Sequence, residues 1–365
     1  MPERSLTILQ LTHQGDVAGS TTMIFSLSQR LARLGHRVLI GCRREALLAR
    51  LAVDAGLEHI PLDFSRLPRL ADALSGVIAQ HHVTVINSHE GRDRRALTWL
   101  RWQRRLPQGF VVTRHTMPLT SPLELVAVGL SADRTIAVSE AVARGLRRRM
   151  YPTGRLTVVP NGIDLARVDA APSAADVAVA RAALGDVGGR PVVVILARRK
   201  DQHILLQGLA GLQRAVVVAC VGLEPDAQLR ELASSIATRH RVVFVPFSES
   251  GQAFYRLATV AALPSRIEGL SLSLLEAMAH GLPVLASDAG GNPDVITSGT
   301  TGVLVPALDP AAWVRALEQV LGNPAFAGRL GRAARDLVRR DFTLERTVER
   351  TEAVYRQALS RRSLS

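Results

Sequence analysis

The sequence predicts an α/β protein built from two doubly wound parallel sheets, and three observations lead to that fold class. Short runs rich in valine, isoleucine and leucine alternate with stretches of helical length along the whole chain, a pattern typical of parallel strands joined by helices. The length of 365 residues exceeds the usual size of one hydrophobic core. A stretch rich in alanine, aspartate and glycine, 170–189, separates the strand-like runs into two sets.

The first set of strand-like runs defines an expected domain over residues 1–169. After a run at 6–11, the pattern predicts a helix over 21–34, which Gly35 is expected to end. The other expected strands of this half lie at 37–41, 83–87, 109–113, 134–138 and 156–160. Residues 170–189 follow as an expected linker.

The second set defines an expected domain over residues 190–342. Its expected strands lie at 191–197, 215–222, 241–247, 259–265 and 283–287. Residues beyond Asp309 are mostly helical in pattern. Since doubly wound sheets bind ligands at the carboxyl ends of their strands, we expect the ligand site in a cleft between the two domains.

Composition favours a cytoplasmic protein. The two cysteines, Cys42 and Cys220, each end an apolar run and are expected to be buried and reduced. The first expected strand follows no signal-peptide pattern, and no apolar run approaches the ~18 residues that cross a bilayer. We therefore expect a soluble protein, or one that is peripheral at the inner face of the plasma membrane.

The formal net charge is +13, and Lys200 is the one lysine among 45 basic residues. An arginine-rich surface can reflect genomic base composition, and it can also serve an anionic partner or membrane. A nucleic-acid partner is not expected, because the sequence has no recognition motif and only 4% aromatic residues.

The most informative segment, PSRIEGLSLSLLEAMAHGLPVLASDAGGNPD, runs from Pro264 to Asp294. Gly269 permits a sharp turn, and the amides of Leu270 and Ser271 are then expected to point out of the first turn of a helix. Anions are favoured at such a helix start, so the segment predicts a phosphate site. Glu268 is expected on the other side of the phosphates.

Glu276 is expected to face outward from the same helix. At 100° per residue it shares a polar stripe with Ser273 and His280. The opposite stripe is expected to hold the helix to a sheet through Leu272, Leu275 and Ala279. A carboxylate in this position can accept two hydrogen bonds from the vicinal diol of a nucleotide ribose.

The two glutamates, with seven residues between them in this segment, resemble the donor-site signature of retaining glycosyltransferases of the GT-B fold, in particular family 4. The resemblance implies two Rossmann-like domains and a last helix, 343–365, that returns to the first domain. It implies that Glu268 acts as a catalytic residue on the transferred sugar, Glu276 holds the ribose, and the helix amides bind the diphosphate.

Arg198 and Lys200, in ARRKDQHILLQGLA, are the expected cations of the donor site. In the family an Arg and, a few residues later, a Lys followed by Gly grip the diphosphate. Here the spacing is compressed and Asp201 replaces the Gly, so Arg199 fits the first role as well as Arg198 does. Two such cations would neutralise charge that grows as the glycosidic bond breaks; a basic surface loop is the alternative.

His115 follows an expected strand, where the family often has a histidine that lines the sugar site. The resemblance implies a catalytic role, with the imidazole bonded to the sugar or to an acceptor hydroxyl; a histidine bonded only to backbone is the alternative. His89 and Glu90, at another strand end, are expected to contact acceptor, and a purely structural role is equally favoured.

The loop 13–22 supplies the other expected acceptor-side residues. Gly19 is expected to allow close approach of the backbone, and Ser20 is expected to cap the following helix. Relatives often have two adjacent glycines here, whereas this chain has AGS. Gly290 and Gly291 match a glycine pair that the family places near the sugar.

Residues 92–105 predict a basic amphipathic helix. Arg94, Arg101 and Arg105 share one face of the helical wheel with Trp102, and Trp99 lies opposite. A tryptophan among arginines on an outer face suits an anionic membrane surface; local packing of Trp102 on a charged, exposed helix is the alternative.

Together with these features, the resemblance implies a retaining glycosyltransferase that moves a sugar from a nucleoside-diphosphate sugar to a hydroxyl of a cell-envelope glycolipid or lipopolysaccharide-type acceptor. We expect a UDP-sugar ahead of GDP-mannose, no cofactor and no metal, since no metal-ligand spacing is visible. The alternatives are a same-fold enzyme with a soluble acceptor and an inactive sugar-nucleotide-binding module. A phosphorylase is not expected, because its Schiff-base lysine would have to be Lys200 in the phosphate loop.

Overall fold

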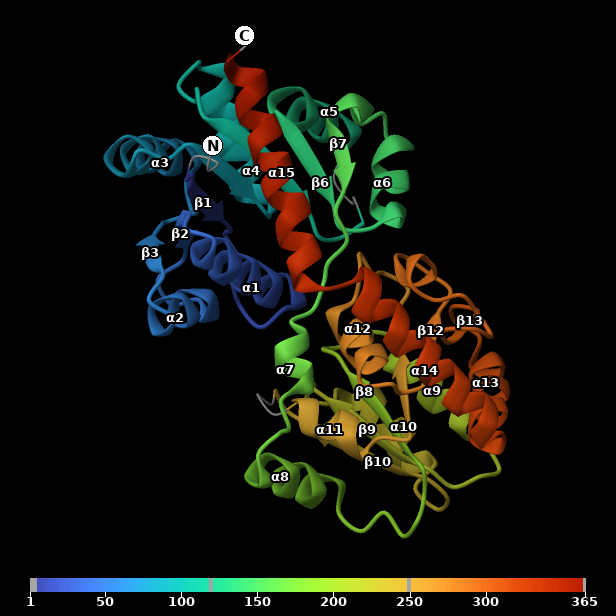
Figure 1. The fold of residues 1–365 in the computed structure, drawn as a ribbon. Helices are drawn as coiled ribbons and strands as arrows, with labels where there is room; N and C mark the ends of the chain where they lie inside the picture. Colours follow the sequence, from blue (N-terminus) through green and yellow to red (C-terminus); the bar gives the residue numbers. More distant parts are fainter. Residues whose placement is uncertain (1–4, 118–120, 248–250, 364–365) are drawn as a thin grey trace. The chain divides into compact units, whose positions relative to one another are not determined.

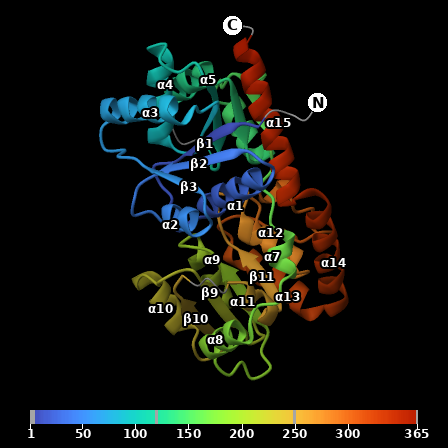
Figure 2. The same ribbon diagram turned by 60° about the vertical axis from the view of Figure 1, so that its left-hand side comes forward.

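The computed structural model describes residues 5–117, 121–247 and 251–363, which form two compact units. The first unit combines Met1–Gly162 with Leu344–Ser365, and the second comprises Ile163–Thr343. Each unit is built around one parallel sheet, and each is described by itself below (Figures 1 and 2).

The sheet of the first unit has the strand order β3-β2-β1-β4-β5-β6-β7. Its strands are β1 (Thr7–Leu11), β2 (Arg37–Cys42), β3 (Glu58–Pro61), β4 (Val85–Ser88), β5 (Gly109–Arg114), β6 (Arg134–Ala137) and β7 (Leu156–Val158). All neighbours pair in parallel, and the order reverses between β1 and β4. Ligands of such sheets bind at that reversal, outside the carboxyl ends of the strands.

Helices cover both faces of this sheet. They are α1 (Gly19–Arg33), α2 (Leu47–Asp54), α3 (Leu67–His81), α4 (Gly91–Trp102), α5 (Pro122–Ser131), α6 (Glu140–Arg147) and α15 (Leu344–Ser363), with a 3₁₀ turn η1 (Thr153–Arg155). The helices α1 and α15 lie side by side on one face, as both views show, while α3, α4 and α5 bury apolar side chains on the other. The last helix, α15, packs on β4, β5 and β6 and therefore completes the first unit.

The sheet of the second unit has the order β10-β9-β8-β11-β12-β13. Its strands are β8 (Val192–Leu196), β9 (Val217–Val221), β10 (Arg241–Val245), β11 (Val260–Leu263), β12 (Val284–Ser287) and β13 (Val303–Val305). The helices are α7 (Leu165–Asp169), α8 (Ala174–Leu184), α9 (Gln202–Leu209), α10 (Ala227–Ser235), α11 (Gly251–Leu257), α12 (Leu272–Ala279), α13 (Pro310–Gly322) and α14 (Pro324–Asp341), with η2 (Asn292–Asp294). The reversal of strand order lies between β8 and β11, and α12 begins just beyond β11.

The expected fold class is confirmed, and the central strands lie where the apolar runs predict them. The strand β9 is buried at every position, as expected of a parallel strand covered on both faces. Cys42 and Cys220 are buried and unbridged, and burial raises the pKa of each thiol to about 12. Within the described part of the chain, every helix is too short or too polar to span a bilayer.

The prediction of a linker at 170–189 is wrong, because this stretch contains helix α8. Ser173 caps the helix by accepting from the amide of Asp176, whose carboxylate bonds back to Ser173. The helix packs against α11 and β10 and so belongs to the second unit. The change of unit falls instead after Gly162, ahead of α7.

The prediction that the arginines of 92–105 share an outer face is also wrong. Arg94 is buried at 6% exposure and donates to the carbonyl of His89. Arg101 turns inward to an ion pair with Asp133 at 3.0 Å. The helix packs into the unit through Ala96, Leu97 and Leu100. Trp102, its last residue, is 65% exposed and donates its indole N–H to the hydroxyl of Ser131.

Candidate active site

In the second unit, two loops meet at the reversal of strand order, one after β8 (197–201) and one after β11 (264–271). Lys200 from the first loop forms an ion pair with Glu268 from the second, with 3.0 Å between Nζ and Oε1. The ammonium also lies 3.4 Å from the carbonyl of Ile267. Residues that the sequence pattern placed in two separate segments are therefore brought into direct contact.

A second ion pair joins the same two loops. The carboxylate of Asp201 accepts from both the amide and the guanidinium of Arg266, at 2.8 and 3.1 Å. Buried Gln202 fixes the loop from within, because its amide group accepts from the amide of Lys200 and donates to the carbonyl of Arg198. Asp201, at the position of a family glycine, thus orders the loop that carries Lys200.

The structure separates the roles of the two adjacent arginines. The guanidinium of Arg199 donates to Asp226 and Gln228, each at 2.8 Å. Arg198 is exposed, and its side chain makes no ion pair or hydrogen bond within the described residues. Arg198 is thus the arginine whose charge remains available at the site.

The backbone around Glu268 is closely packed by a glycine. Gly290 adopts φ +56°, and a Cβ there would lie 2.3 Å from the carbonyl oxygen of Glu268. The amide of Gly291 donates to that same carbonyl at 3.2 Å. Only glycine fits this approach, and it holds Glu268 beside the β8 loop.

Helix α12 starts near this pair. Ser271 is its N-cap and accepts from the amide of Leu274, so that amide is already bonded. Leu270 also has partners within the protein. The amides of Leu272 and Ser273, rather than those of Leu270 and Ser271, are therefore the first-turn donors aligned with the helix axis.

Glu276 lies on α12 but is half-buried instead of facing outward. Burial raises the pKa of its carboxyl group, and the charge of Arg167 acts in the opposite direction. The neighbouring buried Tyr255 donates its hydroxyl to the carbonyl of Ser273 at 2.8 Å. The buried stripe of the helix also differs from the prediction, since Leu272 is half-exposed and the stripe consists of Leu274, Leu275, Ala277, Met278 and Ala279.

In the first unit, two predicted residues lie in contact, since His115 Nε2 and His89 Nδ1 are 2.9 Å apart. The other nitrogen of His89 lies 2.9 Å from Oε1 of Gln10, on β1. Both imidazoles line a small cavity of about 20 Å³ between the sheet and helices α1 and α15. Burial lowers the pKa of His115 to about 4, and burial followed by the charge of His115 lowers the pKa of His89 well below its usual value.

Sequence reasoning missed the residues that orient this pair. Tyr355, from α15, accepts from the side-chain amides of Gln10 and Asn87 at 3.0 and 2.9 Å. With Gln10 Oε1 acting as an acceptor, His89 donates from Nε2 and accepts at Nδ1 from His115 Nε2. The buried Nδ1 of His115 then carries a lone pair, and it has no partner among the described residues.

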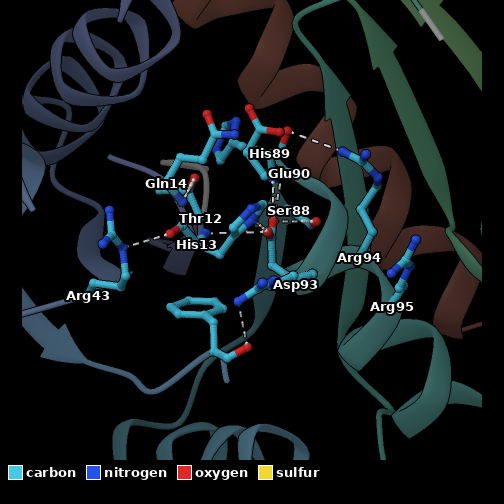
Figure 3. Close-up of polar contacts among 12 residues, drawn as sticks. Thr12, His13, Gln14, Arg43, Ser88, His89, Glu90, Asp93, Arg94 and Arg95 are labelled. Atoms are coloured by element: carbon cyan, nitrogen blue, oxygen red, sulfur yellow. Dashed lines mark hydrogen bonds and ion pairs between the residues drawn. The ribbon is translucent and has the colours of Figure 1, made fainter. Parts of the chain in front are cut away.

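A polar cluster where β1 and β4 end was also missed in part (Figure 3). Asp93, in the first turn of α4, is fully buried. It accepts five contacts, from the hydroxyl of Ser88, the amides of His89, Glu90 and His13, and the ring of His13. The position of the cluster after two neighbouring strands was the signal that could have revealed it.

The predicted cap by Ser20 is wrong. Helix α1 starts at Gly19, with Ala18 as N-cap and no side-chain capping bond. Ser20 therefore lies inside the first turn. Instead, the hydroxyl of Thr21 donates a hydrogen bond to the carbonyl of Asp16, ahead of the helix.

Comparison with known proteins places these sites in context. Residues 17–167 match the model of Glycosyltransferase Family 4, and 189–323 match that of Glycosyl transferases group 1. The D-inositol 3-phosphate glycosyltransferase of Xylanimonas cellulosilytica is 31% identical over 95% of this chain and 94% of its own length. The GDP-mannose-dependent alpha-(1-6)-phosphatidylinositol monomannoside mannosyltransferase of Mycolicibacterium smegmatis is 34% identical over 57% of this chain and 58% of its own. The structure of Anabaena HepE with UDP-glucose has a TM-score of 0.80 at 19% identity, with 94% of this chain and 98% of that chain covered.

Proposed function

The chain belongs to glycosyltransferase family 4 and has the GT-B fold, and from that membership we propose that it is a retaining enzyme that uses a nucleoside-diphosphate sugar. The observation that carries the proposal is the contact between Lys200 and Glu268 at the reversal of strand order in the second unit. A cation and a carboxylate there match the two ends of an activated sugar, its diphosphate and its hydroxyl groups.

In the proposed donor complex, the diphosphate lies at the start of α12. The amides of Leu272 and Ser273 and the helix dipole favour negative charge at this position. Lys200 and Arg198 bind the phosphate oxygens and neutralise the charge that develops on the leaving group. Glu276 accepts hydrogen bonds from the ribose diol. These bonds compensate the hydration that its half-buried carboxylate has lost.

Glu268 exchanges partners in this mechanism. In the free protein it is paired with Lys200; with donor bound, the ammonium turns to the phosphates and the carboxylate is released to the sugar. Its negative charge then faces the positive charge that forms at the reacting carbon. The leaving phosphate takes the acceptor proton, which is consistent with a retaining reaction on one face.

His115 acts on the acceptor side of the proposed reaction. Its ring stays neutral because burial lowers its pKa to about 4, so it can hydrogen-bond a hydroxyl of the sugar or of the acceptor without adding a charge. The contact with His89 fixes the tautomer and the orientation of the ring.

For the acceptor, we propose a hydroxyl of a cell-envelope polyol or glycolipid. Two similar curated proteins are named for inositol phosphate and phosphatidylinositol mannoside substrates, which favours these over a lipopolysaccharide core. The donor is a UDP-sugar or GDP-mannose; a fold neighbour holds UDP-glucose and one relative is named as GDP-mannose-dependent.

We further propose that transfer needs no divalent ion, since cations and helix amides fill that role. Activity should survive EDTA unchanged, and restoration of lost activity by Mg²⁺ or Mn²⁺ would contradict this point.

Peripheral contact with an anionic membrane remains part of the proposal, on a revised surface. Trp102, Leu123 and Leu130 are exposed at 65%, 84% and 61% on α4 and α5, beside exposed Arg104 and Arg105. Apolar side chains among arginines suit an anionic interface. Binding to phosphatidylglycerol vesicles should weaken in Trp102→Ser and with added salt; unaltered binding in both cases would argue against this surface.

Two variants test the donor assignment. Glu276→Ala should weaken UDP binding by about tenfold, because a ribose diol loses two charge-assisted hydrogen bonds. Glu268→Ala should instead depress turnover. Full activity in both variants would remove the proposed site.

A further inference from the structure

Two arginines in the first unit are buried without an anionic partner among the described residues. Arg114 ends β5 and is 5% exposed, and Arg94, in the first turn of α4, is 6% exposed. Because β4 and β5 are paired neighbours, both guanidinium groups lie toward the carboxyl edge of the sheet, where ligands of such folds bind.

Neither arginine has its hydrogen bonds satisfied by the protein. Arg94 donates only to the carbonyl of His89, at 3.2 Å, and its buried Nε has no acceptor in the described part of the chain (Figure 3). The side chain of Arg114 makes no ion pair or hydrogen bond within the described residues. Burial, followed by the neighbouring charge of Arg94, lowers the pKa of Arg114 to about 10. An arginine is almost never buried in this state unless something else pairs with it.

The nearby carboxylates are all engaged elsewhere. Asp93 is saturated by Ser88, His13 and backbone amides. Glu124 holds Arg95 through two bonds of 3.2 and 3.0 Å. Glu90 caps α4 by accepting from the amide of Asp93. Of the charged groups that the structure describes around the two arginines, none is therefore in ion-pair contact with either guanidinium.

We propose that Arg94 and Arg114 form a binding site for a phosphate group of the acceptor. Two guanidinium groups can supply several N–H donors to one tetrahedral oxyanion, and the start of α4 adds a favourable dipole. The inference rests on the proposed function, because it assigns the anionic part of the same acceptor. The phosphate can belong to a soluble phosphate monoester or to a lipid headgroup.

The test measures binding of inorganic phosphate by calorimetry at constant ionic strength. Arg114→Gln should weaken the first-unit component by about tenfold or more, the loss expected for a charge-assisted contact. Lys200→Gln distinguishes phosphate that binds at the donor site from phosphate that binds at Arg94 and Arg114. It should weaken only the former and leave binding in the first unit intact. Arg147→Gln removes an exposed arginine from α6 of the same unit and should change nothing.

Thermal unfolding without phosphate distinguishes a binding role from a structural one. Arg114→Gln should melt at the wild-type temperature or higher, because it removes an unpaired buried charge, and phosphate should no longer stabilise it. Arg114→Lys keeps the charge and should retain part of the phosphate response. A variant that melts lower while its phosphate affinity is unaltered would overturn the inference.

The source of the phosphate is resolved by repeating the comparison with glycerol 3-phosphate and with phosphatidylglycerol vesicles. If Arg114→Gln loses binding of glycerol 3-phosphate alone, the acceptor is a soluble phosphate ester. If it loses binding of both glycerol 3-phosphate and the vesicles, the phosphate belongs to a lipid headgroup. Loss of neither rejects the site. If wild type responds to UDP but Arg114→Gln binds every probe normally, this inference fails while the proposed function stands; absence of any UDP response counts against the proposed function itself.

Discussion

The ion pair between Lys200 and Glu268 predicts that one substitution, Glu268→Gln, will tighten nucleotide binding while it slows catalysis. In the free protein the ammonium is shared with Glu268 at 3.0 Å. A nucleoside diphosphate must compete with that carboxylate for Lys200. Glutamine keeps the shape of the side chain and removes the competing charge.

The size of the effect follows from the geometry. Two unit charges 3.0 Å apart attract by about 5 kcal/mol at an effective dielectric constant of 20. Lys200 is 31% exposed and Glu268 11%, so water compensates most of that energy, and about 1 kcal/mol net is expected. UDP should therefore bind about fivefold more tightly to Glu268→Gln. Turnover should fall about a hundredfold, as for loss of one electrostatic group at a reacting centre.

Calorimetry with UDP and a donor-turnover assay measure both quantities. Glu318→Gln, which removes an exposed carboxylate from α13, is the matched control and should behave as wild type. In a Lys200→Gln background the tightening should disappear, because the competing pair no longer exists. Weaker UDP binding in Glu268→Gln, or undiminished turnover, would refute the reasoning.

Three further predictions follow from the contacts described above. Arg198→Gln should weaken UDP binding about tenfold and Arg199→Gln far less, because the guanidinium of Arg199 is already bonded to Asp226 and Gln228; equal losses in calorimetry would contradict this division. Tyr355→Phe removes the hydroxyl that accepts two amide bonds beside the histidine pair and should lower kcat without altering UDP affinity. Tyr151→Phe, which loses a buried bond to a threonine elsewhere in the unit, should leave kcat intact, and a similar fall in both would indicate general loosening. Since the folded protein lowers the pKa of His115 from 6.5 to about 4, the unfolded chain binds more protons between these values and stability rises with pH across them; in thermal unfolding, His115→Gln should flatten this slope, and an unchanged slope would oppose the assignment.

The sheets could be predicted because their central strands are buried on both faces. A strand such as β9 reads as an unbroken apolar run. The edge strands β3, with the sequence EHIP, and β13, with three residues, lack that signal and were missed. The sequence of α8 was taken for a linker because its small alanines carry little hydrophobic pattern, although Ser173 and Asp176 form a capping box.

The donor residues could be predicted as separate motifs, but their contacts could not. Glu268 and Lys200 lie 68 positions apart, and only the strand order brings their loops together. The predicted outward orientation of Arg94 was wrong, because a helical wheel separates the faces of a helix but does not show which face packs against the sheet. Tyr355 contacts β1 and β4 from the far end of the chain, and a contact between such distant segments cannot be predicted from a local sequence pattern.

The most direct test of the donor site is a crystal structure with a saturating concentration of UDP. We expect the diphosphate at the start of α12, within hydrogen-bond distance of Lys200 and Arg198, the ribose diol on Glu276, and Glu268 parted from Lys200. A nucleotide bound away from α12, or a bound nucleotide with the Lys200–Glu268 pair still closed, would contradict the account.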